Sequence, residues 1–427
     1  MHNKKPIIQK IVMSMTLGLL SFTVLPKPAE AYPVFVEADK FSRFFGQQRA
    51  SLIAIAADKE IKTRIPLHID EVEDGAALVL RNPYAIRELR NSLAHPKKTD
   101  PFFGRLQSVH RMVLDDRHFK LCDQVCLGSI STTAKDICQS PTAQVLFRVS
   151  LQRDQSSAFI VDCGFTPAAQ QWKSEVNFDE KKRTISTQLY DYTYLSDKNI
   201  FFKTLRIKGN KSPVLEQSEV KAFLKPKFLF NLRFKDDDLI SQITSISRTP
   251  HGLSLEVAMA LNLLAMKINN QICCDVSFYE DSLYFPVVLD LPFSGSSFAN
   301  GSGVFFGFQR ESKDSLKTEY IAAESADLSD AIIIEQKESL LVIGMRNSNS
   351  KRKNGAKPKI VSQKDMSSID FLPVESKNGI FYDIKNTEKG FQHFNVWIFL
   401  GSIKDKEKLI EYAQKGPQIT AEYMPFN

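Results

Sequence analysis

After residue 25 the sequence lacks any apolar run long enough to cross a bilayer. The one extended apolar run, Ile11 to Leu25, is shorter than the about 20 residues that a membrane-spanning helix needs. No cysteine follows it that could carry a lipid anchor. We therefore expect no transmembrane helix in the mature chain and no lipid at its N-terminus.

Recognisable catalytic and cofactor motifs are also missing. The nucleophile elbow G-x-S-x-G, the H-E-x-x-H pair, the P-loop, the G-x-G-x-x-G loop and the haem motif C-x-x-C-H are all absent. One S-x-x-K match, Ser348 to Lys351, lies in a lysine-rich stretch, whereas an acylating serine needs a rigid helix start. The sequence thus predicts no cofactor and identifies no catalytic residue.

The first 31 residues have the order of a secretory signal peptide. Three lysines precede the apolar run, two prolines follow it, and Ala29-Glu30-Ala31 then offers small residues two positions apart. We expect cleavage before Tyr32, with residues 1–31 removed. The mature protein is then exported to the periplasm, the cell envelope or the extracellular space.

The charge balance of the mature chain is mildly basic. Removing residues 1–31 takes away four lysines and one glutamate, which lowers the formal net charge of +7 by three. Such a surface permits attraction to an acidic envelope protein, an anionic polymer or a lipid surface, but requires none of them. We expect no nucleic-acid partner.

All six cysteines lie in the mature part, and an even number in an exported chain suggests disulfides. Cys122, Cys126, Cys138 and Cys163 cluster, so we predict at least one bridge among these four, with the connectivity left open. Cys273 and Cys274 are adjacent and would point to opposite faces of a strand. Zinc would require a second close pair beside Cys122-x-x-x-Cys126, and none has that spacing, so we expect no metal.

Alternating apolar residues predict antiparallel strands in the middle of the chain. Residues 145–151 and 159–165 alternate around a short polar loop, which is typical of a hairpin, and residues 228–234 repeat the pattern. Residues 253–268 are ambiguous, because their composition favours a helix while their alternation favours a strand. The preceding turn, residues 249–252, leads us to favour a hairpin. The predicted fold class is mainly β, with antiparallel sandwich-like sheets and α+β parts at both ends.

We divide the mature chain into three consecutive parts. Residues 32–115 form a mixed α/β domain with a helix that starts at Asn82-Pro83. Residues 116–310 form the antiparallel β-rich domain. Residues 311–427 form an α+β domain with a strand that carries Trp397, a helix over 403–415 and a basic loop over 346–364.

Two groups of side chains are candidate binding elements. The basic loop contains seven basic residues and no acidic one between Ser339 and Lys364, and it could bind an anionic partner. Three tyrosines share one face of a predicted strand, and they form either an aromatic platform or part of the core. The residues concerned are Lys351, Arg352, Lys353, Lys357 and Lys359 in the loop, and Tyr190, Tyr192 and Tyr194 in the strand.

Two further groups could carry chemistry. Residues 68–74 hold one histidine and four carboxylates, which could bind Ca²⁺ but lack the glycine-punctuated loop of an EF-hand, so an acidic turn is the simpler interpretation. Asp115, Asp116 and His118 could form a carboxylate-supported base, although the sequence identifies no nucleophile beside them.

The sequence therefore predicts an exported protein with a binding or structural assembly role. One alternative is an exported hydrolase of envelope polymers that uses His118 or His251. A second alternative is an outer-membrane β-barrel, whose strands would also alternate. The ligand, the partner and the oligomeric state stay open.

Overall fold

The computed structural model describes most of the chain from Ala31 to Pro425. The described residues are 31–71, 110–196, 199–227, 232–234, 239–261, 272–291, 294–309, 317–323, 328–347, 358–368, 374, 376, 378–385, 387–388 and 390–425. They are mostly β-strands in antiparallel sheets, which confirms the predicted fold class.

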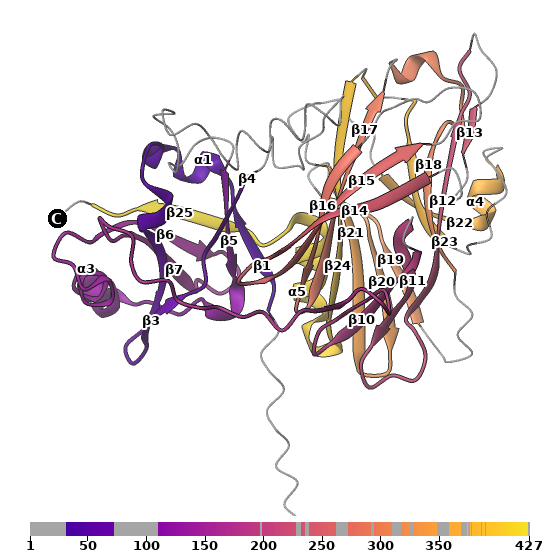
Figure 1. The fold of residues 1–427 in the computed structure, drawn as a ribbon. Coiled ribbons are helices and arrows are strands. Elements are labelled where there is room, and N and C mark those ends of the chain that lie inside the picture. Colours follow the sequence, from indigo (N-terminus) through magenta and orange to yellow (C-terminus); the bar gives the residue numbers. More distant parts are fainter. Residues whose placement is uncertain are drawn as a thin grey trace, which may run out of the picture.

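The first lobe contains two small antiparallel sheets. The three-stranded sheet has the order β1-β5-β4, and the five-stranded sheet has the order β25-β6-β7-β2-β3. The three-stranded sheet comprises β1 (Pro33–Val36), β4 (His68–Glu71) and β5 (His110–Asp115). The five-stranded sheet comprises β2 (Leu52–Ala57), β3 (Lys62–Ile65), β6 (Gln144–Leu151), β7 (Ser157–Asp162) and β25 (Ile419–Tyr423). The C-terminal strand thus completes a sheet begun near the N-terminus (Figure 1).

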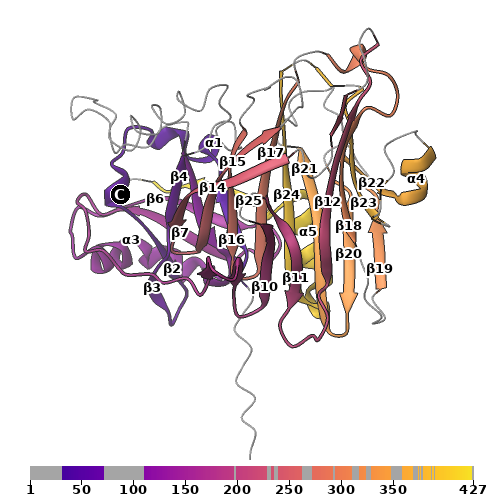
Figure 2. The same ribbon diagram turned by 45° about the vertical axis from the view of Figure 1, so that its right-hand side comes forward.

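The second lobe is a sandwich of two large sheets. The nine-stranded sheet contains β8 (Asn177–Asp179), β9 (Thr184–Ser186), β10 (Tyr190–Ser196), β11 (Asn199–Ile207), β12 (Leu215–Leu224), β13 (Leu232–Phe234), β18 (Gly303–Gln309), β22 (Pro358–Ser362) and β23 (Asn378–Asp383). The eight-stranded sheet contains β14 (Leu239–Arg248), β15 (Gly252–Leu261), β16 (Ile272–Tyr279), β17 (Ser282–Leu291), β19 (Lys317–Ile321), β20 (Ala331–Gln336), β21 (Ser339–Asn347) and β24 (Gly390–Ser402). Figure 2 shows the long strands of the two sheets one behind the other.

In the part of the chain that the structure describes, four helices accompany these sheets. They are α1 (Ala38–Phe41), α3 (Gln124–Cys138), α4 (Gln363–Ser368) and α5 (Lys406–Lys415). Side chains of α3 pack on one face of the five-stranded sheet, and Met366 of α4 packs on the outer face of the nine-stranded sheet. Within the described residues every helix is too short or too polar to span a membrane.

The three-stranded sheet connects the two lobes because its strands alternate. Met112 and Leu114 of β5 point into the core shared with the five-stranded sheet, whereas Val113 between them points the other way. Val113 joins a second core with Leu409 and Tyr412 of α5, on the outer face of the eight-stranded sheet. The layers therefore follow one another from α3 through the four sheets to α4 (Figure 1).

The predicted hairpins are confirmed. β6 and β7 pair antiparallel with Ser150 opposite Ser157. β14 and β15 pair across the turn at residues 249–252, with Arg248 opposite Leu253, so alternation outweighed helical composition in this segment. Gly252 is needed in this turn, because a Cβ atom there would lie 2.1 Å from the carbonyl oxygen of Phe278. The second half of the ambiguous segment, residues 262–271, lies outside the described residues, as does the helix predicted to start at Asn82-Pro83.

Candidate functional site

The interface between the lobes carries a cluster of charged side chains around the end of β5. The strand ends at Asp115, whose carboxylate accepts a hydrogen bond from the backbone N–H of Arg117 at 3.1 Å. This cap starts the short 3₁₀-helix η3 (Asp116–His118). The turn brings Asp115, Asp116 and His118 to the surface of the first lobe that meets the second lobe.

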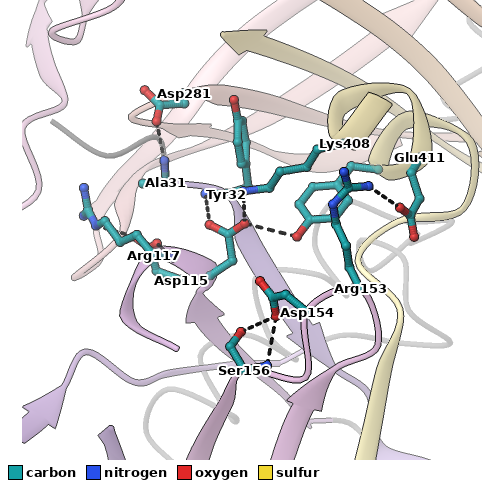
Figure 3. Close-up of polar contacts among 12 residues, drawn as sticks. Ala31, Tyr32, Asp115, Arg117, Arg153, Asp154, Ser156, Asp281, Lys408 and Glu411 are labelled. Atoms are coloured by element: carbon teal, nitrogen blue, oxygen red, sulfur yellow. Dashed lines mark hydrogen bonds and ion pairs between the residues drawn. The ribbon is translucent and has the colours of Figure 1, made fainter. Parts of the chain in front are cut away.

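Asp116 joins the two lobes. Its side chain is 2% exposed, and one carboxylate oxygen lies 2.7 Å from Nζ of Lys408 and 3.1 Å from the hydroxyl group of Tyr412, both on α5. The other oxygen accepts a hydrogen bond from the backbone N–H of Tyr32 at 2.9 Å. Figure 3 shows Tyr32 beside Lys408 of α5. Asp116 therefore acts as a link between elements, with its oxygens already engaged.

Asp115 and Arg117 make a second link. The guanidinium group of Arg117 lies 3.0 Å from the Asp115 carboxylate and 2.5 Å from the carboxylate of Glu280, in the turn between β16 and β17. Burial raises the pKa of Asp115 to about 8, and the negative charges of Asp116 and Glu280 add to this rise against the opposing effect of Arg117. The Asp115 carboxylate, which was predicted to support His118 as a base, thus contacts Arg117 instead.

The structure brings together three histidines that are far apart in the sequence. His68, His118 and His251 lie close enough that a charge on either of the first two disfavours a proton on His251. Burial lowers the pKa of His251 to about 3, with this repulsion as a further cause. Burial also lowers the pKa of His118 to about 4, and the neighbouring Arg117 charge contributes. Both rings are consequently neutral at pH 7, the state in which an imidazole can act as a base.

His251 has unused hydrogen-bonding capacity. It is 4% exposed, and neither ring nitrogen has a hydrogen bond of good geometry within the described part of the chain. The turn that holds it is fixed by Thr249, whose hydroxyl oxygen accepts from the backbone N–H groups of His251 and Gly252 at 3.3 and 3.0 Å. The backbone of this buried imidazole is therefore held in place.

We expect His251→Leu to remove part of the protein's sensitivity to acid. In the unfolded chain a histidine binds a proton below about pH 6.5, whereas the buried ring of His251 stays neutral down to about pH 3. The folded-state pKa is depressed, so stability is lost as the pH falls through this window, by at most about 1.4 kcal/mol per pH unit. Urea unfolding between pH 7 and 4 should show a flatter profile for the variant, and parallel profiles would contradict the assignment.

The Asp70 carboxylate on β4 contacts two side chains, those of His68 and Arg111. The His68 imidazole lies 2.8 Å from Asp70, and Arg111 lies 3.2 Å from the same carboxyl group. Burial alone would raise the pKa of Asp70, but the hydrogen bond from His68 and the charge of Arg111 outweigh it and hold the pKa at about 2. Asp70 therefore has a guanidinium counter-ion rather than a calcium ion. The side chain of Glu71 and residues 73 and 74 lie outside the description, and no group of three metal-binding side chains occurs among the residues that it includes.

The four clustered cysteines form two disulfides, which confirms the prediction of at least one bridge among them. Cys122 bonds to Cys126 at the start of α3, and Cys138 at its end bonds to Cys163 just after β7. The second bridge fastens the end of α3 to the segment after β7, and all four cysteines pack with Ile130 in one apolar cluster. Cys273 and Cys274 lie on β16, and their side chains are not described.

The three tyrosines of β10 lie inside the sandwich. Tyr190, Tyr192 and Tyr194 are at most 4% exposed and belong to the core between the two large sheets. The hydroxyl group of Tyr190 donates to the carbonyl oxygen of Tyr279 at 2.8 Å, and that of Tyr192 donates to Ile200 at 2.5 Å. An aromatic platform needs accessible rings. These three tyrosines are therefore part of the core and do not form a platform.

Most of the basic loop lies outside the described residues. Of its five central basic residues, Lys359 on β22 is described, and its side chain is exposed. Anion binding by Lys351, Arg352, Lys353, Lys357 and Lys359 stays a prediction.

An apolar surface at the far end of the first lobe was not predicted from the sequence. Leu121 and Val125 are 67% and 72% exposed, and they precede the two cysteines of the first disulfide. An ion pair of 3.0 Å between Lys59 and Asp123 brings the turn between β2 and β3, with the 42% exposed Ile61, to the same end of α3. We call Ile61, Leu121 and Val125 the apolar tip.

Comparison with known proteins gives few matches. No family model and no curated protein matches the sequence. Among solved structures, an α-mannosidase from Enterococcus faecalis V583 is 8% identical, with a TM-score of 0.37 over 94% of this chain and 47% of that chain. A glycosyl hydrolase family 38 protein from Enterococcus faecalis is also 8% identical, with a TM-score of 0.40 over 91% of this chain and 50% of the other. The chain thus spans about half the length of both structures.

Proposed function

We propose that the protein is exported and binds an envelope protein through the apolar tip. The observation that carries this proposal is the exposure of Leu121 and Val125, each directly before one cysteine of a disulfide. A contiguous patch of exposed apolar side chains, unlike a single exposed one, marks an interaction site. The disulfide fixes the backbone beneath them, so little conformational entropy is lost on binding.

The charges around the apolar tip favour a protein partner over an anionic polymer or lipid. Basic and acidic side chains alternate there and balance, so no single-sign field surrounds the apolar residues. The residues concerned are Lys59, Lys62 and Lys120 on the basic side, and Asp58, Glu60 and Asp123 on the acidic side. A neutral apolar surface of this kind matches a partner surface that is itself apolar.

We expect the double substitution Leu121→Ser and Val125→Ser to weaken partner binding at least tenfold. Burying either side chain in an interface contributes about 1.5–3 kcal/mol, and its exposed position in the free protein means that folding gains little from it. A photo-crosslinking residue at position 125 should trap one defined envelope protein. The purified partner should then bind the unmodified protein and bind the double variant more weakly, with an unchanged melting temperature.

The matched control is Ile246, which is 46% exposed on β14 in the other lobe. Ile246→Ser should leave binding intact, and a crosslinker there should not trap the same protein. Equal trapping from both positions, or trapping of lipid or polymer from position 125, would refute the proposal.

Hydrolysis of an envelope polymer is a second candidate. It is favoured by His118, a partly exposed imidazole whose lowered pKa keeps it neutral beside His251. Turnover of envelope polymers by the purified protein, lost on His118→Ala with the fold retained, would support this role instead of the binding role.

A further inference from the structure

The residue expected to begin the mature chain is fully buried. Tyr32 is 0% exposed, and its hydroxyl group donates to the carbonyl oxygen of Leu400 on β24 at 2.9 Å. Its backbone is held as well, because its carbonyl oxygen accepts from the backbone N–H of Asp116 at 3.0 Å. Contacts with Leu400 in the second lobe and with Asp116 in the first lobe thus fix the position of the Tyr32 backbone nitrogen.

Two carboxylates lie at the backbone nitrogens on either side of the expected cleavage point. The N–H of Tyr32 donates to Asp116 at 2.9 Å, and the N–H of Ala31 donates to Asp281, in the turn between β16 and β17. Figure 3 shows the carboxylate of Asp281 directed at the backbone nitrogen of Ala31. A peptide N–H offers one donor and no charge, whereas a free α-ammonium group offers three donors and a positive charge.

Four buried carboxyl groups gather around this stretch of backbone. They belong to Asp115, Asp116, Glu280 and Asp281, all at most 17% exposed at the side chain or 9% exposed as residues. Arg117 contacts the carboxylates of Asp115 and Glu280, and Lys408 contacts that of Asp116. Clustered buried carboxylates repel one another, so an additional positive charge at the Tyr32 nitrogen would be stabilised here.

We propose that cleavage before Tyr32 creates an α-ammonium group that pairs with Asp116 and locks the first lobe to the second. This inference rests on the export that we propose above. Asp116 then bridges the new N-terminus to Lys408 and Tyr412 of α5. The mature protein therefore gains an ion pair where its precursor has only the hydrogen bond of an uncharged amide.

The pairing predicts how stability changes with pH. An α-ammonium group has a pKa of about 7.7–8.0 in an unfolded chain, and a carboxylate beside it raises the folded-state value. The stabilisation is therefore complete below about pH 7.7 and is lost as the pH rises through the folded-state pKa. Other titratable and charged side chains lie on the elements packed around this nitrogen, so any two chains that are compared must have the same set of them. The set comprises Asp115, Asp116, Arg117 and His118 at the end of β5 and in η3, Glu280 and Asp281 in the β16–β17 turn, Lys408, Glu411 and Tyr412 on α5, and Asp154 in the β6–β7 turn.

The test compares two chains that differ in the charge at this nitrogen. One begins at Tyr32 with a free amino group, released from a cleavable fusion. The other begins one residue earlier with Ala31→Gln, whose cyclisation to pyroglutamate leaves an uncharged amide at Tyr32. All other titrating groups are identical. The unfolding equilibrium constant at pH 7 should be at least tenfold smaller for the first chain, and this ratio should approach one above about pH 10.

Two further measurements keep the test decisive. Asp116→Asn should abolish the difference between the two chains, because it removes the counter-ion from both. If that variant does not fold, the pH dependence of the rate at which an acylating reagent modifies the α-amino group of the folded Tyr32 chain reports its pKa. We expect a value of about 9 or above, because a tenfold stabilisation corresponds to a rise of about one pKa unit. Equal stability of the two chains from pH 7 to 10, with an unshifted amino group, would overturn the inference. Because both N-termini are made in vitro, this result is independent of whether export itself occurs.

Discussion

Replacing Tyr32 by alanine should lower the free energy of unfolding of the mature protein by about 3–5 kcal/mol, the usual range for removing a large buried aromatic side chain. Its ring has edge contacts with Phe399 and Tyr412, at centroid distances of 5.8 and 5.9 Å, and Lys408 lies 4.8 Å from its centre. This expectation is unusual, because the first residue of a mature chain is ordinarily dispensable.

Tyr32→Phe is the matched control for this substitution. It keeps the ring and removes only the hydrogen bond to the carbonyl oxygen of Leu400, so it should cost about 1–2 kcal/mol. Urea unfolding of both variants, made in chains that begin at residue 32, separates the packing contribution from the polar one. A loss below about 0.5 kcal/mol for the alanine variant would contradict the buried position of Tyr32.

The second large effect concerns the disulfides. Replacing Cys138 and Cys163 together by serine opens a loop with a sequence separation of 25 residues, which in the chain-entropy model costs about 3 kcal/mol. Replacing Cys122 and Cys126 opens a loop with a separation of only 4 residues, and the same model gives about 2 kcal/mol. The first pair should therefore matter more.

Both serine pairs are compared with the oxidised protein by urea unfolding without reductant. Each pair serves as the other's control, because both bridges involve α3 and both substitutions introduce two hydroxyl groups into the same apolar cluster. Unchanged stability in both variants, or a larger loss for the shorter loop, would contradict the assigned connectivity and its mechanism.

The alternation of apolar residues made much of the fold predictable. A strand that packs on one face repeats every two residues, and this pattern identified β6, β7 and β15 correctly. Helix α3 was missed, because its many serines and threonines have low helix propensity. The available signal was the four-residue spacing of Cys126, Ile130, Ala134 and Cys138, all of which are buried.

The candidate sites were less predictable, because their residues meet through long-range contacts. Asp116 and His118 were noted in the sequence, but Tyr412, which donates to Asp116, is 296 residues away. No local pattern indicates that Glu280 and Asp281, in an ordinary two-residue turn, reach Arg117 and Ala31. Tyr32 was noted only as the residue after a cleavage site. The division of the mature chain into three consecutive domains stays a prediction.

The central claim is that the working protein is an exported, oxidised chain that begins at Tyr32. The most direct test is the intact mass, measured without reduction, of the protein recovered from outside the cytoplasm of its own cells. We predict the mass of residues 32–427, lowered by the hydrogen atoms lost in forming the disulfides Cys122–Cys126 and Cys138–Cys163. A main product that retains Met1, begins at another residue, or contains only free thiols would contradict the account.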